Sequence, residues 1–329
     1  MISEQCNYKA FIDYSRLKLE LNNEYGIFVD KISLMSDFCA SVYLLCTADK
    51  KYVFKLYRNY DTEIALQSAD IIDYLLNHSF PVTPIICTKN GYATISLFFS
   101  EGNRTGILFD YIDGVIGYDL NYKSYAAKMG ETIGLLHSLM EKYDKSIIQY
   151  GKEHYVGRYI NLMKEFNYSH SKINELEEYG DILWNSIIKT KPGFCHGDLN
   201  PSNFIKTPNN EYILFDFDCA GIAYPINDIF TICNTICSFE RFDIATYNEP
   251  AKKFLLLRHG YEKYRKLNEY DISAIYAFVG LNCYWITAQL DKYKSPLEGR
   301  QWLSKNYFNN QYDWLMCWKN LCKDNGLPF

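Results

Sequence analysis

The chain has 329 residues, of which 48% are hydrophobic and 22% are charged, and its formal net charge at pH 7 is -5. A chain of this length holds one large domain or two lobes with a substantial core, and the composition excludes the polar, charge-rich sequences of disordered proteins. The sequence pI of about 5.7 excludes a basic field that would hold a nucleic-acid backbone, so nucleic acid is not an expected partner.

The N-terminal segment and the cysteines indicate the cellular compartment in which we expect the protein. The chain does not open with a basic segment followed by an apolar run, and no window reaches the roughly 18 apolar residues of a membrane span. The 11 cysteines include no C-x-x-C pair, and Cys233 and Cys237, four apart on an expected helix, lack a second pair or a nearby histidine to complete a zinc site. We therefore expect reduced thiols, no membrane association and a cytoplasmic location.

The first third of the chain has the pattern of a small β-rich lobe. Short runs of β-branched and aromatic residues between polar turns predict strands at 25–29, 40–47, 52–56, 92–99 and 106–111. Apolar residues at helical spacing predict one helix over 62–78, which Pro81 and Pro84 end. Antiparallel strands beside this helix are the expected arrangement.

The rest of the chain is dominated by helical patterns. Apolar residues with a helical period predict helices at 125–143, 154–188, 228–239, 249–267 and 271–290, and one more in the aromatic-rich tail. The segment 192–221 interrupts them with short apolar strands and turns rich in Pro and Asn. The sequence thus predicts an α+β fold with two lobes, a small antiparallel β lobe over 1–113 and a large, mainly α-helical lobe over 114–329.

The interrupting segment carries polar residues that suit phosphoryl transfer. It runs from Cys195 to Asn203 as C-H-G-D-L-N-P-S-N, and an apolar strand then leads to Asp216. Phosphoryl transfer needs a carboxylate that orients the attacking hydroxyl and accepts its proton, and oxygen ligands that fix magnesium on the phosphates. Asp198, Asn203 and Asp216 have the residue types and the spacing for these roles.

His196-Gly197-Asp198 with Asn203, followed by Asp216 after a hydrophobic strand, resembles the aminoglycoside phosphotransferase and choline kinase superfamily, which has the bilobal protein-kinase-like fold. The catalytic loop of that superfamily is H-G-D-x-x-x-x-N, whereas protein kinases have Arg at the position of Gly197. The resemblance implies an ATP-dependent, Mg2+-requiring kinase that phosphorylates a hydroxyl of a small molecule. It further implies that Asp198 is the catalytic base, that Asn203 and Asp216 are magnesium ligands, and that His196 braces the loop.

Nucleotide binding is expected in the first lobe. Lys55 shares one face of its strand with largely apolar neighbours, so it needs an anionic partner. In the superfamily a helical glutamate pairs with this lysine; we favour Glu63, with Asp70 as the alternative. The loop that would cover the phosphates contains no glycine, and we expect Ser36 and Ser41 to offer hydroxyls or backbone N–H groups instead.

The segment between the lobes also resembles that of the superfamily. The resemblance implies that the backbone of Asp110, Tyr111 and Ile112 binds adenine, and Gly114 would let the chain turn into the second lobe.

The sequence indicates less specific roles for three further residues. Asp218 either assists the metal or caps the segment that follows it. Asp228 stands where the superfamily often has an acidic residue at a helix start, and N-capping accounts for it. His137 is expected to be a packed core histidine.

Two alternatives have the same fold and a different function. A protein Ser/Thr kinase is disfavoured because only eleven residues separate Asp216 from Asp228, without the long activation segment that holds peptides. A nucleotide-binding scaffold without activity is disfavoured because Lys55, Asp198 and Asn203 are all present together with Asp216.

The sequence leaves the acceptor open. A polycationic aminoglycoside would need an acidic cleft, for which the candidates are Asp119, Glu131, Glu240, Asp243 and Asp291. Choline would need an aromatic cage, for which the candidates are Trp285, Trp302 and Trp314 with neighbouring tyrosines. Homoserine, methylthioribose and other sugars or amino alcohols are further possibilities, and the sequence does not indicate the oligomeric state.

Overall fold

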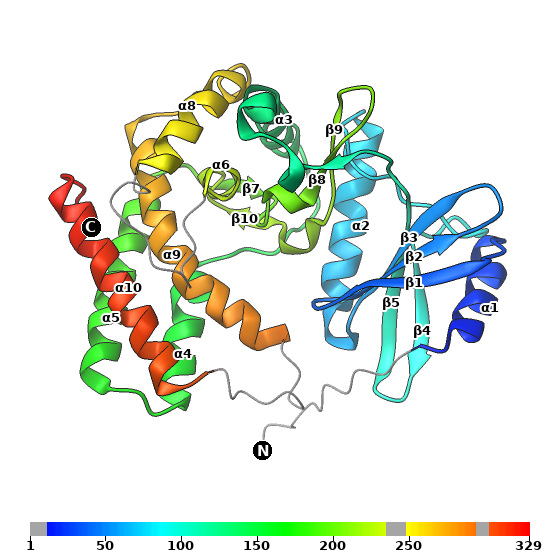
Figure 1. The fold of residues 1–329 in the computed structure, drawn as a ribbon, viewed down its shortest axis with the longest axis horizontal. Coiled ribbons are helices and arrows are strands. Elements are labelled where there is room, and N and C mark those ends of the chain that lie inside the picture. Colours follow the sequence, from blue (N-terminus) through cyan, green and yellow to red (C-terminus); the bar gives the residue numbers. More distant parts are fainter. Residues whose placement is uncertain (1–11, 235–247, 294–302) are drawn as a thin grey trace. The chain divides into compact units, whose positions relative to one another are not determined.

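The structure is a computed structural model that describes residues 12–234, 248–293 and 303–329 (Figure 1). Internal contacts divide these residues into two compact units, the first made of 12–115 and 204–219 and the second of 116–203, 220–292 and 303–329. The predicted boundary after residue 113 lies two residues before the first break in this division. The prediction placed 204–219 in the second lobe, whereas their contacts group them with the first unit.

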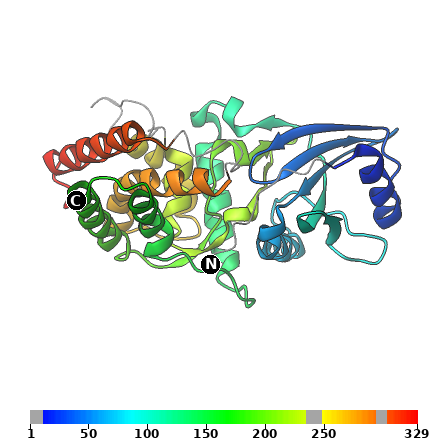
Figure 2. The same ribbon diagram turned by 90° about the horizontal axis from the view of Figure 1, so that it is seen from below.

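A five-stranded antiparallel sheet is the framework of the first unit. Its strands in spatial order are β1 (Lys31–Asp37), β2 (Ser41–Cys46), β3 (Lys51–Leu56), β5 (Gly102–Asp110) and β4 (Thr94–Phe99). The predicted strands at 40–47, 52–56, 92–99 and 106–111 are thus formed. Helices α1 (Tyr14–Tyr25) and α2 (Thr62–Asn77) lie on either side of the sheet (Figures 1 and 2).

The two faces of this sheet have separate apolar cores because neighbouring side chains of a strand point to opposite faces. Leu17 of α1 packs in one cluster with Phe54 of β3, while Ala65 of α2 packs in the other with Ile107 of β5. Lys55 follows Phe54 and lies directly opposite Ile107 in the register. The alternation therefore directs Lys55 to the face that α2 covers.

The prediction of a strand at 25–29 was wrong. The carboxylate of Asp13 accepts the backbone N–H groups of Ser15 at 2.7 Å and Arg16 at 3.0 Å, which begins a helix that continues to Tyr25. Gly26, with φ 72°, ends that helix in the left-handed conformation. The first strand therefore begins only at residue 31.

Helices make up most of the second unit. They include α3 (Tyr122–Met140), α4 (Arg158–Glu165), α5 (His170–Ile187), α6 (Ile226–Cys233), α8 (Glu249–Tyr261), α9 (Glu269–Tyr293) and α10 (Lys305–Asp324). The predicted helix over 154–188 is divided, because a π-helical turn (Glu153–Gly157) precedes α4 and Asn167, with φ 49°, separates α4 from α5. Among the helices in the described part of the chain, none has the length and hydropathy that a membrane crossing needs.

Close backbone packing joins α3 to α8. A Cβ atom on Gly130 of α3 would overlap the carbonyl of Leu257 in α8, so only glycine allows this approach. The same approach brings Tyr261 of α8 next to His137 of α3, with 2.9 Å between the hydroxyl and Nδ1. His137 is thereby held in the core between α3 and α8.

The short strands of the segment 192–221 belong to both units. In the second unit β7 (Gly193–Cys195) pairs with β10 (Gly221–Ala223). In the first unit β8 (Phe204–Lys206) and β9 (Tyr212–Leu214) form a hairpin, beside which β6 (Val115–Ile116) completes a small sheet. A Cβ on Gly114 would overlap the carbonyl of Lys206, so this glycine is required by a close approach to β8.

Candidate active site

The loop that follows β7 holds Asp198 by both of its carboxylate oxygens. The side-chain amide of Asn200 donates to Oδ1 at 2.9 Å, and that of Asn203 donates to Oδ2 at 3.1 Å and to the Asp198 carbonyl at 2.7 Å. Gly197 has φ 83°, a left-handed conformation that favours glycine and explains the G of H-G-D in this chain. The loop therefore fixes the direction in which the Asp198 carboxylate points.

A buried carboxylate holds the backbone of this loop. Asp228 in α6 is fully buried and accepts the backbone N–H of His196 at 2.7 Å and that of Gly197 at 2.9 Å. Nε2 of His137 lies 3.0 Å from the same carboxylate. The predicted N-capping role of Asp228 was wrong: the residue lies inside α6, whose N-cap is Pro225, and its carboxylate instead supports the loop that carries Asp198.

The protonation of His137 follows from its two partners. Burial lowers the pKa of His137 more than the neighbouring Asp228 raises it, so the imidazole is neutral at pH 7. A carboxylate only accepts hydrogen bonds, which requires the proton on Nε2. Burial also raises the pKa of Tyr261, which keeps its hydroxyl proton and donates it to Nδ1. His137 is a core histidine, as predicted, and its position is linked to the loop.

The orientation of the Asn203 side chain bears on metal binding. Its NH2 group makes both hydrogen bonds to Asp198, which turns the amide oxygen the other way. That oxygen has no hydrogen-bond donor among the described residues. An amide oxygen is a ligand that Mg2+ accepts, so the residue fits the predicted role.

In the first unit Lys55 lies between two carboxylates. Its Nζ is 2.6 Å from Oδ1 of Asp216 and 2.6 Å from Oδ2 of Asp218, and the hydroxyl of Tyr57 donates to Asp218 at 2.8 Å. Asp216 lies two residues after β9 and has φ 66°, a left-handed conformation that Asp tolerates better than most residues. Its side chain is 38% exposed, against 11% for Lys55.

The charges in this cluster do not balance. Burial lowers the pKa of Lys55, but the charges of Asp216 and Asp218 outweigh burial and raise it well above the usual value. Burial raises the pKa of Asp218 to about 6, although Lys55 acts in the opposite direction. Two carboxyl groups therefore share one ammonium, which leaves the cluster suited to a further cation.

The structure gives Lys55 partners other than the predicted one. Within residues 12–234 its ion pairs are with Asp216 and Asp218, while Glu63 is exposed in the first turn of α2. The alternative, Asp70, is also exposed. Asp218, which the sequence left undecided, is thus a direct partner of the lysine.

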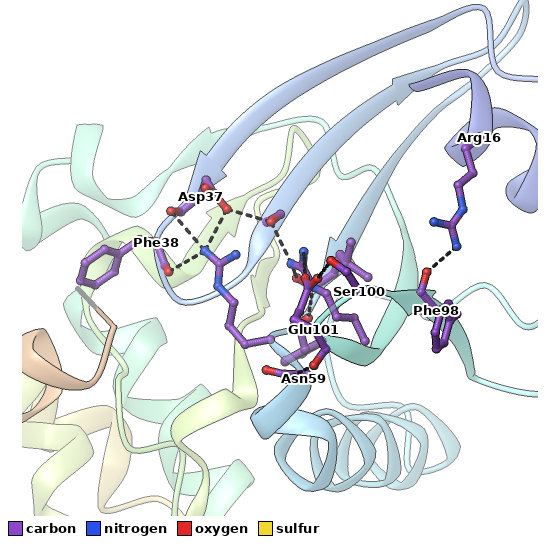
Figure 3. A network of polar contacts seen from close by, with 12 residues as sticks. Arg16, Asp37, Phe38, Asn59, Phe98, Ser100 and Glu101 are labelled. Carbon is purple, nitrogen blue, oxygen red and sulfur yellow. Dashed lines mark hydrogen bonds and ion pairs between the residues drawn. The ribbon is translucent and has the colours of Figure 1, made fainter. Parts of the chain in front are cut away.

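The glycine-free loop between β1 and β2 is held by arginines (Figure 3). Nη2 of Arg58 donates to Oδ1 of Asp37 at 2.9 Å and to the carbonyl of Phe38 at 3.2 Å. Ser41 donates its hydroxyl to Asp37 at 2.8 Å and accepts a bond from Arg104 at 3.1 Å. The Ser41 hydroxyl is therefore used within the loop, whereas the other predicted serine, Ser36, is exposed at a bulge of β1.

The predicted adenine-binding segment follows β5. The N–H of Asp110 donates to the carbonyl of Pro84 at 2.9 Å, and that of Tyr111 donates to the Asp110 carboxylate at 3.1 Å. The N–H of Ile112 has no acceptor among the described residues. Ile112 is therefore the residue of this segment whose N–H is available to a base.

Several of the remaining candidates lie outside the described residues or make structural contacts. Cys237, Glu240, Asp243 and Trp302 lie outside the described residues. Within the described residues no group of three or more His, Cys, Asp or Glu side chains is arranged to hold a metal ion. Glu131 forms ion pairs with Lys128 and Lys263, and Trp314 stacks on Trp318, which are structural contacts.

Comparison with known proteins places this geometry in context. The sequence model of the phosphotransferase enzyme family matches residues 33–267, which is more than two thirds of the chain. The matched range includes the Lys55 cluster, the catalytic loop and Asp228.

Solved structures show the same fold at low identity. An amicoumacin kinase in complex with AMP-PNP, Ca2+ and Ami is 19% identical, with a TM-score of 0.71 over 97% of this chain and 96% of that one. A microcompartment-associated aminopropanol kinase is 16% identical, with a TM-score of 0.71 over 96% of this chain and 99% of that one. These likenesses confirm the predicted protein-kinase-like fold.

Two curated relatives match shorter stretches. They are uncharacterized proteins of Deinococcus radiodurans, 27% identical over 138 residues, and of Synechocystis sp., 22% identical over 205 residues. The matches cover 39% and 58% of this chain, and 36% and 55% of the length of those proteins.

Proposed function

The chain belongs to the phosphotransferase enzyme family, and we propose that it transfers the γ-phosphate of ATP directly to a hydroxyl group of a small molecule. The observation that carries this proposal is the fixed carboxylate of Asp198, held on both oxygens in a loop that the buried Asp228 anchors. A base must have a defined direction to take the proton of an attacking hydroxyl. Hydrogen bonds within the second unit fix the direction of the Asp198 carboxylate.

Asp198 is the proposed catalytic base. The side-chain amides of Asn200 and Asn203 orient its carboxylate, so the acceptor hydroxyl can donate to it while its oxygen attacks the phosphorus. The proton passes to Asp198, and the terminal phosphate passes from ATP to the acceptor oxygen, which leaves ADP. No covalent enzyme intermediate is needed.

Asn203 and Asp216 are the proposed ligands of Mg2+. The amide oxygen of Asn203 and the partly exposed carboxylate of Asp216, in a cluster with excess negative charge, fit a hard cation that prefers oxygen. Bound Mg2+ would neutralise charge on the phosphates. The structure of an amicoumacin kinase with the same fold contains Ca2+ together with AMP-PNP, which supports the proposal of a divalent cation in this chain.

The first unit is the proposed nucleotide-binding part. Lys55, held between two carboxylates, would contact the phosphates, and the backbone of Ile112 with its neighbours Asp110 and Tyr111 would bind adenine. Because the hydroxyl of Ser41 is engaged, the phosphate loop would contribute backbone N–H groups and the exposed Ser36. The predicted pairing of Glu63 with Lys55 has no support, because Lys55 is paired with Asp216 and Asp218.

A small acceptor is favoured over a protein substrate. The residues between Asp216 and α6 are folded as a 3-10 turn (Phe217–Cys219) and as β10, which is paired with β7. This leaves no long segment of the kind on which protein kinases hold a peptide. Nucleic acid is not a proposed partner because the net charge is -5.

The test is ADP release, measured by a coupled assay with ATP, Mg2+ and a panel of hydroxyl-bearing small molecules. We expect Asp198→Asn to lower kcat about 10²- to 10⁴-fold, the usual contribution of a general base. Asp144→Asn, which changes an exposed aspartate of the second unit, is the matched control and should have no effect. An Asp198→Asn enzyme that turns over as fast as the control would refute the assignment.

A further inference from the structure

A cluster of aromatic side chains in the second unit has no role in the chemistry described above. We call it the His154 cluster and define it by Tyr150, His154, Tyr155 and Trp285. The ring of His154 lies over that of Tyr150, with centroids 4.1 Å apart, and meets that of Tyr155 at 5.1 Å and 82°. The rings of Tyr150, His154 and Trp285 are only half-buried, so they form part of the surface.

The hydrogen bond from Trp285 determines the protonation of His154. The indole Nε1–H lies 2.9 Å from Nε2 of His154. An indole nitrogen can only donate, so Nε2 must be the unprotonated acceptor and the imidazole proton must be on Nδ1. That proton has no hydrogen-bond acceptor among the described residues. The cluster thus presents one fixed N–H donor beside half-buried aromatic rings.

The charges that act on this imidazole are positive. Burial, together with the charges of Arg158 and Lys292, lowers the pKa of His154 to about 3, so the ring stays neutral. Nη2 of Arg158 donates to the Ala288 carbonyl at 3.0 Å, which holds that guanidinium between α4 and α9. Aromatic faces attract cations, but here two cationic side chains act at the same place and oppose a positively charged ligand.

Backbone hydrogen bonds connect the cluster to the catalytic loop within the second unit. The N–H of Tyr150 donates to the carbonyl of Ile222 at 2.9 Å, which adds this segment to the edge of β10. β10 pairs in turn with β7, and Gly221 lies opposite Cys195, three residues before Asp198. Neighbouring strands are about 4.8 Å apart, so the segment before His154 lies roughly 10 Å from β7.

We propose that the His154 cluster binds the acceptor, and that the acceptor is a neutral, ring-shaped polyhydroxy compound of the sugar type. The inference rests on the proposed kinase function. The weakly positive C–H groups of such a ring would lie on the aromatic faces, which are negative, and one of its oxygens would accept the Nδ1–H of His154. A cationic amine would meet the like charges of Arg158 and Lys292.

The test compares acceptors of different charge and shape in the ADP-release assay with the full chain. Methyl β-D-ribofuranoside, D-glucose and myo-inositol represent neutral rings, and choline and kanamycin represent cations. We expect turnover with at least one neutral ring and a lower kcat/KM for both cations. Turnover with a cation and with none of the neutral rings overturns the inference while the kinase function stands. Lack of turnover with every compound overturns it too, and ATP-dependent thermal stabilisation then shows whether the nucleotide half of the proposed function survives.

Variants separate acceptor binding from packing. His154→Phe keeps a ring and removes the Nδ1–H, so we expect the KM for the neutral acceptor to rise about 5-fold or more, the effect of one lost hydrogen bond. Trp285→Phe removes the bond that sets the tautomer and should act in the same direction. In both variants kcat and the KM for ATP should be unchanged. Trp314→Phe, in α10, is the matched control. An acceptor KM in His154→Phe and Trp285→Phe equal to that of the control would overturn the inference.

Discussion

We expect Asp228→Asn to lower the stability of the second unit and to loosen the loop that carries Asp198. The carboxylate accepts hydrogen bonds from the N–H groups of His196 and Gly197 and from Nε2 of His137. An amide of the same shape has one oxygen, so its NH2 group must face at least one of these donors. A buried donor left unsatisfied costs about 1 to 3 kcal/mol, and the loss of charge from the remaining bonds adds about 1 kcal/mol. We expect a loss of about 2 to 4 kcal/mol in the free energy of unfolding.

The catalytic effect follows from the position of these bonds. They hold the two residues immediately before Asp198, and a displacement of about 1 Å at a reacting group costs about 10²-fold in rate. We therefore expect kcat to fall about 100-fold while the KM for ATP changes little, because the nucleotide groups belong to the first unit.

Urea unfolding followed by tryptophan fluorescence measures the loss of stability, since all five tryptophans lie after residue 183 and so report on the C-terminal part of the chain. Asp313→Asn, which changes an exposed aspartate of α10, is the control for the loss of one charge. If Asp228→Asn retained both the unfolding midpoint and the turnover of this control, the reasoning about the anchor would be refuted.

Three further substitutions test the first unit and the metal ligands. Lys55→Met leaves two carboxylates without their ammonium, and we expect the KM for ATP to rise about 10- to 100-fold in ADP-release kinetics; an unchanged KM would contradict the assignment. Asn203→Ala should raise the Mg2+ concentration for half-maximal rate at least about 10-fold, which a magnesium titration at fixed ATP measures, and a superimposable titration would exclude the residue as a ligand. Arg58→Ala should raise the KM for ATP several-fold with kcat unchanged, because the arginine holds the loop between β1 and β2. A fall in kcat with an unchanged KM would contradict this role of Arg58.

The loop that carries Asp198 could be located from the sequence because its residues lie close together along the chain, while its catalytic role stays a prediction. Asp198 and Asn203 are five residues apart, and the hydrogen bonds between them follow from the short loop that joins them. Gly197 is required by its own φ of 83°. The family match confirms the resemblance drawn from these residues, and the fold that the resemblance implied is confirmed as well.

The support of the loop could not be predicted because it depends on contacts distant in sequence. Asp228 lies 31 and 32 residues from the N–H groups that it accepts, and from the sequence it had an adequate explanation as a helix cap. The sequence predicts an ion pair between Lys55 and an acidic residue of the next helix. Its partners in the structure, Asp216 and Asp218, lie far along the chain. Hydrophobic periodicity locates the elements, but it does not specify which polar side chains meet across them.

In the proposed function, the loop between β1 and β2 takes the place of a glycine-rich phosphate loop. A glycine-rich loop is conformationally free, so ordering it over a nucleotide costs conformational entropy at the moment of binding. Here Arg58 holds the carboxylate of Asp37 and the carbonyl of Phe38, and the hydroxyl of Ser41 holds Asp37 from the opposite side. These contacts fix the loop in the absence of a nucleotide, so under the proposed function ordering the loop would add little to the cost of binding ATP. If the loop covers the phosphates as proposed, it should act on the affinity for ATP and not on the chemical step, so Arg58→Ala should change KM and leave kcat unchanged.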